Sequence, residues 1–240
     1  MNTDRKHVPE VIPTNTCPQT LEELTLRSRA FSAYAPVVHL DVSDNKFAPT
    51  QSWPFFEGQW AELDSMGVGP TKLPLVGSPL QYEVHLMIEN PLSAGVAFAR
   101  AGVSRVIAHV EAFKNADSAR DAFKMWRVSG AREIGLAILM DTPLDALRSY
   151  TDLCDEFLVM TIATVGKQGI PFDERGVARV KELHARHPQI TIAVDGGVSE
   201  KNIGALAKAG ATRFCAGSAI EKQAQPAEAY ARLLQQVIAH

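Results

Sequence analysis

The sequence predicts a single (β/α)8 barrel domain spanning residues 1–240. Short apolar runs with strand character alternate with longer amphipathic segments, and this rhythm is typical of parallel βαβ units. Eight such runs occur at roughly regular spacing, and 240 residues with 46% hydrophobic side chains suffice for one large core. The same alternation allows an open doubly wound sheet, but the number and spacing of the runs favour the closed barrel.

The expected elements follow one another along the whole chain. The strands are predicted at 8–15, 36–42, 82–88, 105–112, 134–140, 156–163, 190–197 and 212–220. Helices are predicted between them at 91–102, 117–130, 143–154, 173–187 and 199–210. Several begin with a Pro, Asp or Ser start signal, and three end at a glycine, namely Gly102, Gly130 and Gly210.

One connection departs from this rhythm. Residues 44–79, between the second and third expected strands, read as an irregular insertion rich in Pro, Gly and aromatic residues. Long irregular connections in compact domains are usually functional or disordered, and the aromatic side chains around Trp53 and Trp60 argue against full disorder. We expect this segment to form either a lid or a surface that contacts another subunit. The second alternative would make the protein a homo-oligomer.

Composition excludes several classes of protein. The 24 basic and 27 acidic residues give a formal net charge of −3 without long charged runs, so we expect no nucleic-acid groove and no membrane-binding patch. Cys17, Cys154 and Cys215 form no CxxC pair, which argues against a disulfide framework or a structural zinc site. Without an apolar signal core or a membrane-length run, the sequence predicts a cytoplasmic protein.

Four ionisable residues fall in or at the ends of expected strands, where such barrels carry their active sites. His39 and Asp41 in VVHLDVSD are two residues apart and so share one face of a strand, while His85 lies in the third run and Asp195 ends the seventh. Two His and two Asp suit one divalent transition metal such as Zn, Mn or Fe. The alternative is that each is a hydrogen-bonded polar residue of the core.

Two further groups lie near the same rim. His109 and Glu111 end the fourth run, and they either support the metal ligands through hydrogen bonds or form a separate buried pair. The stretches VDGGVSEKN and CAGSAI follow the last two strands, where free N–H groups and a helix start favour an anion. The expected phosphate-binding residues there are Gly196, Gly197, Gly217 and Ser218.

Together these motifs resemble the ribulose-phosphate 3-epimerase family. The resemblance is carried, in family order, by VIPTNT, VVHLDVSDNKFAP, YEVHLMIENP, GVSRVIAHVEAF, VMTI, AVDGGVSEKN and CAGSAI. It implies a metal-dependent isomerase that inverts carbon 3 of a ketose phosphate, either ribulose 5-phosphate/xylulose 5-phosphate or a related sugar phosphate. His39, Asp41, His85 and Asp195 match the family's metal ligands, and the two Asp match its acid–base pair.

The chain departs from the family pattern at specific positions. Ser43 replaces a Met, and Thr14 stands where a Ser is usual, so that the hydroxyl is kept. The loop 163–169 reads ATVGKQG where the family usually shows NPGFGGQ. Lys167 supplies a charge for an anionic group, and the loop's character is partly kept by Gly166, Gln168 and Gly169.

Two other functions remain open from the sequence. One is a sugar- or nucleotide-phosphate decarboxylase on a similar barrel; those relatives place a Lys in a DxKxxD motif, and Ser43 occupies that position here. The other is a non-catalytic sugar-phosphate sensor, which has little need of two carboxylates at a metal. Both are less consistent with the residues than epimerisation.

Overall fold

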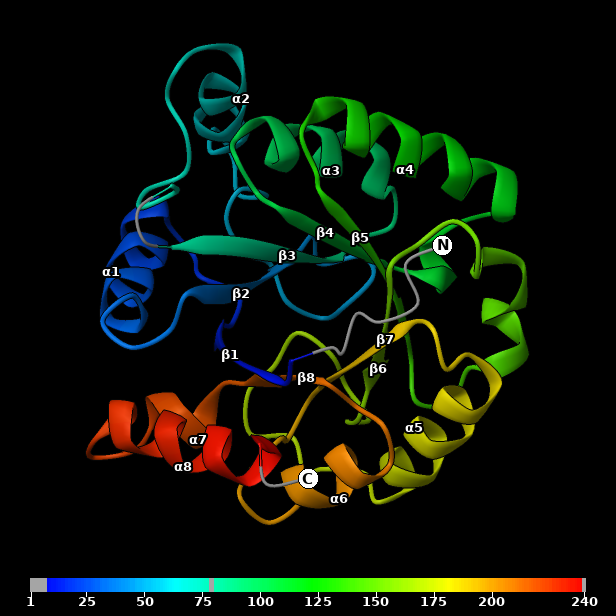
Figure 1. The fold of residues 1–240 in the computed structure, drawn as a ribbon. Helices are drawn as coiled ribbons and strands as arrows, with labels where there is room; N and C mark the ends of the chain where they lie inside the picture. The colour runs from blue at the N-terminus through cyan, green and yellow to red at the C-terminus, as the bar shows by residue number, and fades with distance from the viewer. Residues whose placement is uncertain (1–7, 78–79, 239–240) are drawn as a thin grey trace.

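The computed structural model describes residues 8–77 and 80–238, and within these ranges eight parallel strands close into a barrel (Figure 1). Each strand pairs with its neighbours in sequence, and the last pairs with the first. The predicted (β/α)8 barrel is confirmed, and the open sheet is excluded. The strands are β1 (Glu10–Asn15), β2 (Val37–Ser43), β3 (Gln81–Met87), β4 (Arg105–His109), β5 (Glu133–Ile138), β6 (Glu156–Met160), β7 (Thr191–Asp195) and β8 (Arg213–Ala216).

Helices surround the strands on the outside of the barrel (Figure 1). Thr20 and Asn115 cap the first and fourth α-helices by accepting hydrogen bonds from backbone N–H groups. Gly130 ends the fourth with a φ of 123°, a conformation that glycine adopts at little cost. The α-helices are α1 (Leu21–Phe31), α2 (Trp60–Val68), α3 (Pro91–Arg100), α4 (Ala116–Ser129), α5 (Arg175–Arg186), α6 (Ile203–Lys208), α7 (Ser218–Glu221) and α8 (Pro226–Ile238).

Two crossover segments differ from the sequence prediction. The segment 44–79 is less irregular than its composition indicated, because α2 (Trp60–Val68) forms within it. Trp53 is fully buried and donates its indole N–H to Glu62 of α2 (2.9 Å), so this aromatic residue anchors the crossover to the barrel. The helix predicted at 143–154 is instead a 3-10 helix, η2 (Leu144–Tyr150), and a second short one, η1 (Val110–Ala112), follows β4.

The barrel interior is filled in layers. A small apolar cluster that includes Ile107, Leu158 and Cys215 occupies its middle, separate from the larger core between strands and helices. Ion pairs between strands that are not neighbours, such as Arg105 to Glu10 (3.6 Å), cross the interior below that cluster. We call the residues of this layer the charged floor; they are Glu10, Glu83, Arg105, Glu133, Glu156 and Arg213.

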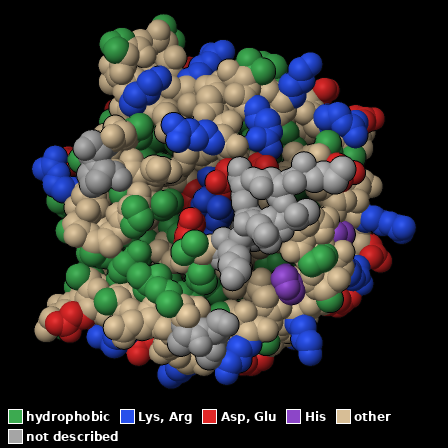
Figure 2. Space-filling model, in the orientation of Figure 1, with side chains coloured by type: hydrophobic (Ala, Val, Ile, Leu, Met, Phe, Trp, Pro, Cys, Tyr) green, Lys and Arg blue, Asp and Glu red, His purple; other side chains and the backbone are tan. Residues whose placement is uncertain are grey.

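The charged floor lies at the amino-terminal ends of the strands. All of its members except Glu83 are the first residue of their strand. Figure 2, in the orientation of Figure 1, shows basic and acidic side chains side by side near the middle of this face. None of the helices within the described ranges combines the length and the hydrophobicity that a membrane span requires.

Candidate active site

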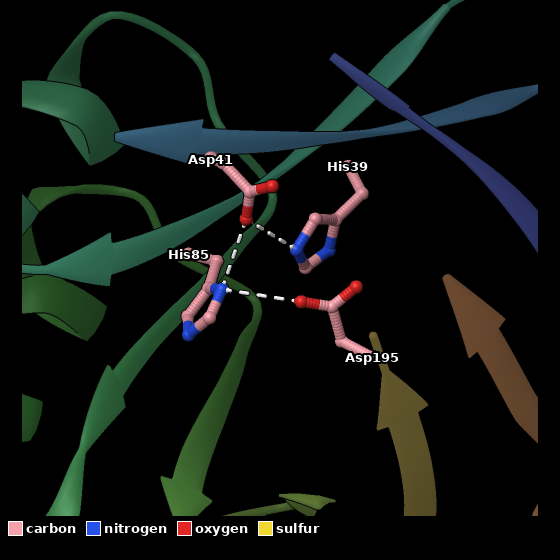
Figure 3. A group of neighbouring side chains, drawn as sticks. All are labelled: His39, Asp41, His85 and Asp195. Carbon is pink, nitrogen blue, oxygen red and sulfur yellow. Dashed lines mark hydrogen bonds and ion pairs between the residues drawn. The ribbon is translucent and has the colours of Figure 1, made fainter. Parts of the chain in front are cut away.

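The four predicted metal ligands converge inside the barrel (Figure 3). One donor atom of each lies within 4.8 Å of the others. Asp41 Oδ1 lies 3.1 Å from His39 Nε2 and 3.0 Å from His85 Nδ1, and Asp195 Oδ2 lies 3.9 Å from the same His85 nitrogen. The period of two in β2 and the register that pairs Asp41 with His85 bring the first three together. Barrel closure adds Asp195 from β7.

The donor set fits a divalent cation. Two imidazole nitrogens and two carboxylate oxygens face one another, and carboxylate oxygens only accept hydrogen bonds. Both histidines are fully buried, so bulk solvent screens the charges of this group only weakly. Four electron-rich atoms at this spacing repel unless a proton or a cation lies between them. Mixed nitrogen and oxygen shells are the ones that Zn, Mn and Fe accept in proteins.

The two carboxyl groups have different proton affinities. Burial opposes the ionisation of Asp41, but His39 and His85 hold its pKa well below the usual range. Burial and the negative charge of Asp41 raise the pKa of Asp195 to about 6. Pairs of carboxyl groups whose pKa values are pushed apart in this way are typical of acid–base sites.

His109 and Glu111 are hydrogen-bonded to each other and to the site. His109 Nε2 lies 2.9 Å from His85 Nε2, and His109 Nδ1 lies 3.2 Å from Glu111, which also accepts from the backbone N–H of Leu139. Burial lowers the pKa of His109 to about 4. A neutral His109 that carries its proton on Nδ1 donates it to Glu111, and its Nε2 then accepts a hydrogen bond from the Nε2–H of His85. The lone pair of His85 is then on Nδ1, which leaves that nitrogen free to bind a metal.

The predicted phosphate-binding residues line one pocket together with Asp41 and Asp195. The Thr14 hydroxyl is buried there and has no hydrogen-bond partner within the described part of the chain. Gly197 has a φ of 68°, and an added Cβ would lie 2.9 Å from the backbone nitrogen of Phe172, so only glycine fits. The other predicted residues that line the pocket are Gly166, Lys167, Gln168, Gly169, Gly196, Gly217 and Ser218.

The altered loop 163–169 is tied to the barrel through Gln168. Its side-chain amide donates to Thr16 (3.1 Å) after β1 and to Glu221 (3.0 Å) in α7. Lys167 is exposed at the pocket edge. The loop therefore forms one wall of the pocket despite its unusual sequence.

Sequence reasoning missed two residues that touch His39. Glu83 Oε1 lies 2.5 Å from His39 Nδ1, and Cys215 Sγ lies 3.3 Å from the same nitrogen. Glu83 precedes His85 by two residues, so the period of two in a strand already places both on the interior face. Nothing local in the sequence indicates that β8 brings Cys215 against His39.

A closed eight-stranded barrel whose rim holds a His/Asp quartet beside a glycine-lined pocket defines an enzyme of the (β/α)8-barrel class. Residues 19–221 match the model of the ribulose-phosphate 3 epimerase family. The chain is 32% identical over 203 residues to the ribulose-phosphate 3-epimerase of Escherichia coli (strain K12), covering 82% of this chain and 81% of that one. It is 29% identical over 212 residues to the enzyme of the same name from Candida glabrata, covering 87% and 84%.

The chain therefore belongs to the ribulose-phosphate 3-epimerase family and is an isomerase of that type. Among solved structures it is similar to a 3-keto-L-gulonate-6-phosphate decarboxylase from Vibrio cholerae, with a TM-score of 0.69 and 15% sequence identity. That match covers 97% of this chain and 99% of the other, and at this identity it shows the fold alone.

Proposed function

We propose that the protein epimerises carbon 3 of a ketose phosphate, ribulose 5-phosphate/xylulose 5-phosphate or a related sugar phosphate, with one divalent transition metal. The observation that carries this proposal is the convergence of His39, Asp41, His85 and Asp195 beside a glycine-lined pocket. These four residues would hold the metal, which would be Zn, Mn or Fe. A bound cation stabilises the negative charge that develops on an enediolate.

Asp41 and Asp195 are the proposed proton carriers. They come from β2 and β7, and both line the pocket, so a sugar lying between them meets one carboxyl on each face. One carboxylate takes the proton from carbon 3, which leaves the enediolate, and the other, protonated, delivers a proton to the opposite face. The reaction returns one proton for each that it removes and needs no further reactant.

The remaining pocket residues are proposed to bind and orient the sugar phosphate. The Thr14 hydroxyl, which has no hydrogen-bond partner among the described residues, lies where it can bond the substrate, and Lys167 adds a positive charge at the pocket edge. Gly197, Gly217 and Ser218 lie after β7 and β8, where barrels of this type commonly hold a phosphate. His109 and Glu111 are proposed to fix the orientation of His85 through the hydrogen bonds described above.

The decarboxylase alternative lacks a cationic side chain at position 43. Ser43 is buried and donates its hydroxyl to the Thr50 carbonyl (2.7 Å). A decarboxylase of the DxKxxD type needs a Lys at that position, and a hydroxyl committed to the backbone does not replace it. The similarity to decarboxylase structures concerns the fold and does not favour their chemistry.

Incubation with ketose phosphates in heavy water tests the proposal. We expect deuterium at carbon 3, no release of carbon dioxide, and about one transition-metal ion per chain. Asp195→Asn should lower the rate of epimerisation by about 100-fold or more, while Asp145→Asn, which alters an exposed surface ion pair with Arg186, should leave it unchanged. Carbon dioxide release would identify a decarboxylase, and binding without exchange would identify a sensor.

A further inference from the structure

Glu83 connects the proposed metal site to the charged floor. Its Oε1 lies 2.5 Å from His39 Nδ1, and its Oε2 forms an ion pair with Arg105. The Glu83 and His39 side chains are both fully buried or nearly so. A carboxylate bridging a histidine and an arginine in this way is held on both sides.

The contact fixes which imidazole nitrogen carries the proton. A carboxylate oxygen only accepts hydrogen bonds, so a nitrogen 2.5 Å away must donate to it. The Cys215 thiol, which also approaches His39 Nδ1, lies within 3.5 Å of Glu83 and can donate to the same carboxylate. Nε2 lies 3.1 Å from the Asp41 carboxylate, which also only accepts, so a cation bound at the quartet takes the place of a proton on Nε2 while Nδ1 keeps its proton toward Glu83.

We propose that Glu83 is a positioning residue, which holds His39 in the Nδ1–H tautomer and directs its Nε2 lone pair at the metal, while Arg105 holds Glu83 in place. This inference rests on the proposed metal-dependent function. Carboxylates that accept from a metal-binding histidine orient the ring and increase its basicity. Glu83 thus serves His39 as His109 is proposed to serve His85, from the floor of the barrel instead of its rim.

A competing interpretation makes Glu83 a metal ligand itself. His39, Glu83 and Cys215 form a second group of donor atoms within 4.8 Å of one another. Arg105 argues against a cation there, because its guanidinium is paired with Glu83 and repels a second positive charge. The two interpretations differ in the number of metal ions that each chain binds.

The experiment compares zinc binding by the wild-type protein, Glu83→Gln and Glu133→Gln, measured by competition with a chromophoric chelator. Glu133 is the matched control because it pairs with the same Arg105 (3.0 Å), while no hydrogen bond joins it to His39 within the described residues. We expect Glu83→Gln to weaken Zn²⁺ binding about 10- to 100-fold and Glu133→Gln to leave it nearly unchanged. The wild type should bind one Zn²⁺ per chain.

Nitrogen-15 NMR of the imidazole rings provides a readout that a purely structural role would not produce. In the Zn²⁺-loaded wild-type protein, His39 should carry a proton at Nδ1 and none at Nε2. This measurement needs no variant, so it decides the inference even if Glu83→Gln fails to fold. Protonation at Nε2 would overturn the inference.

The other outcomes separate the inference from the function on which it rests. If the wild type binds Zn²⁺ but both variants bind it equally well, or lose it equally, Glu83 has no positioning role while the proposed function stands. Two Zn²⁺ ions per chain would also overturn the inference, because Glu83 would then be a ligand. A wild type that binds no transition metal would reject both.

Discussion

Replacing Thr14 by Val should raise stability and lower activity at the same time. Thr14 lies in β1 and is 3% exposed, and its hydroxyl has no partner within the described residues although it lines the pocket. Valine has nearly the same shape without the hydroxyl. A buried polar group without a hydrogen bond costs about 1–3 kcal/mol, so the substitution should raise the free energy of unfolding by about 1 kcal/mol.

The activity should change in the opposite direction. If the hydroxyl bonds the sugar phosphate, its loss removes one hydrogen bond worth about 0.5–1.5 kcal/mol, which corresponds to about a 2- to 12-fold lower kcat/KM. Initial rates with the accepted ketose phosphate and urea unfolding of the same preparation measure the two quantities. The combination of higher stability and lower activity is characteristic of a group kept for binding.

Thr161→Val provides the matched control. The Thr161 hydroxyl is also buried, but it donates to the backbone carbonyls of Asp195 (3.0 Å) and Gly196 (2.5 Å). The same chemical change should therefore lower the free energy of unfolding, by about 1 kcal/mol or more. If Thr14→Val destabilises the protein as much as Thr161→Val, or leaves kcat/KM unaltered, our account of Thr14 is wrong.

Four other predictions concern the metal, the proton carriers, the loop and the floor. Dialysis against a chelator should abolish epimerisation, and one of Zn²⁺, Mn²⁺ or Fe²⁺ should restore it; full activity in metal-free protein would refute this. Asp195→Asn should lower kcat by about 100-fold or more, as steady-state rates will report. Lys167→Met should raise KM with kcat nearly constant, whereas an unchanged KM would place Lys167 away from the phosphate. Burial alone would raise the pKa of Glu133, but the charges of Arg105 and Arg213 outweigh burial and lower it below its ordinary value of 4.5. The ionised carboxylate therefore stabilises the fold above about pH 4.5, and this stabilisation is lost as the pH falls further. Glu133→Gln should therefore reduce stability at pH 7 more than at pH 3.5, which urea unfolding at the two pH values can test.

The barrel was predictable because its signals are local. A parallel strand buried on both faces reads as a short apolar run, and eight of them in order leave few topologies. Helix α2 was not predicted, because its sequence WAELDSMGV is short and contains Gly67 near its end. Burial of Leu63 and Met66 and the bond from Trp53 to Glu62 hold it in place, and such tertiary contacts are not visible in a local pattern.

In the site, too, the sequence predicted what local spacing determines and missed what tertiary contacts determine. His39 and Asp41 were predicted to share a face because they are two residues apart, and the barrel architecture then brought in His85 and Asp195. The charged floor was missed because Glu10, Glu133 and Arg213 begin their strands, where polar residues are expected to meet solvent. Only closure of the barrel brings Arg213 beside Glu10 on the neighbouring strand and opposite Glu133 across the interior.

The proposed proton carriers lie on strands, whereas the part of the pocket that departs from the family pattern lies on a loop. The four proposed metal ligands and His109 lie on strands, whose register fixes them relative to one another. The loop 163–169 reaches the pocket from outside the sheet and is attached to it through Gln168. A change in that loop would alter the shape and charge of the pocket wall, whereas Asp41 and Asp195 are held by the register of their strands. We therefore infer that the departure from the family pattern at 163–169 bears on the choice of ketose phosphate, while proton transfer depends on strand residues that match the family.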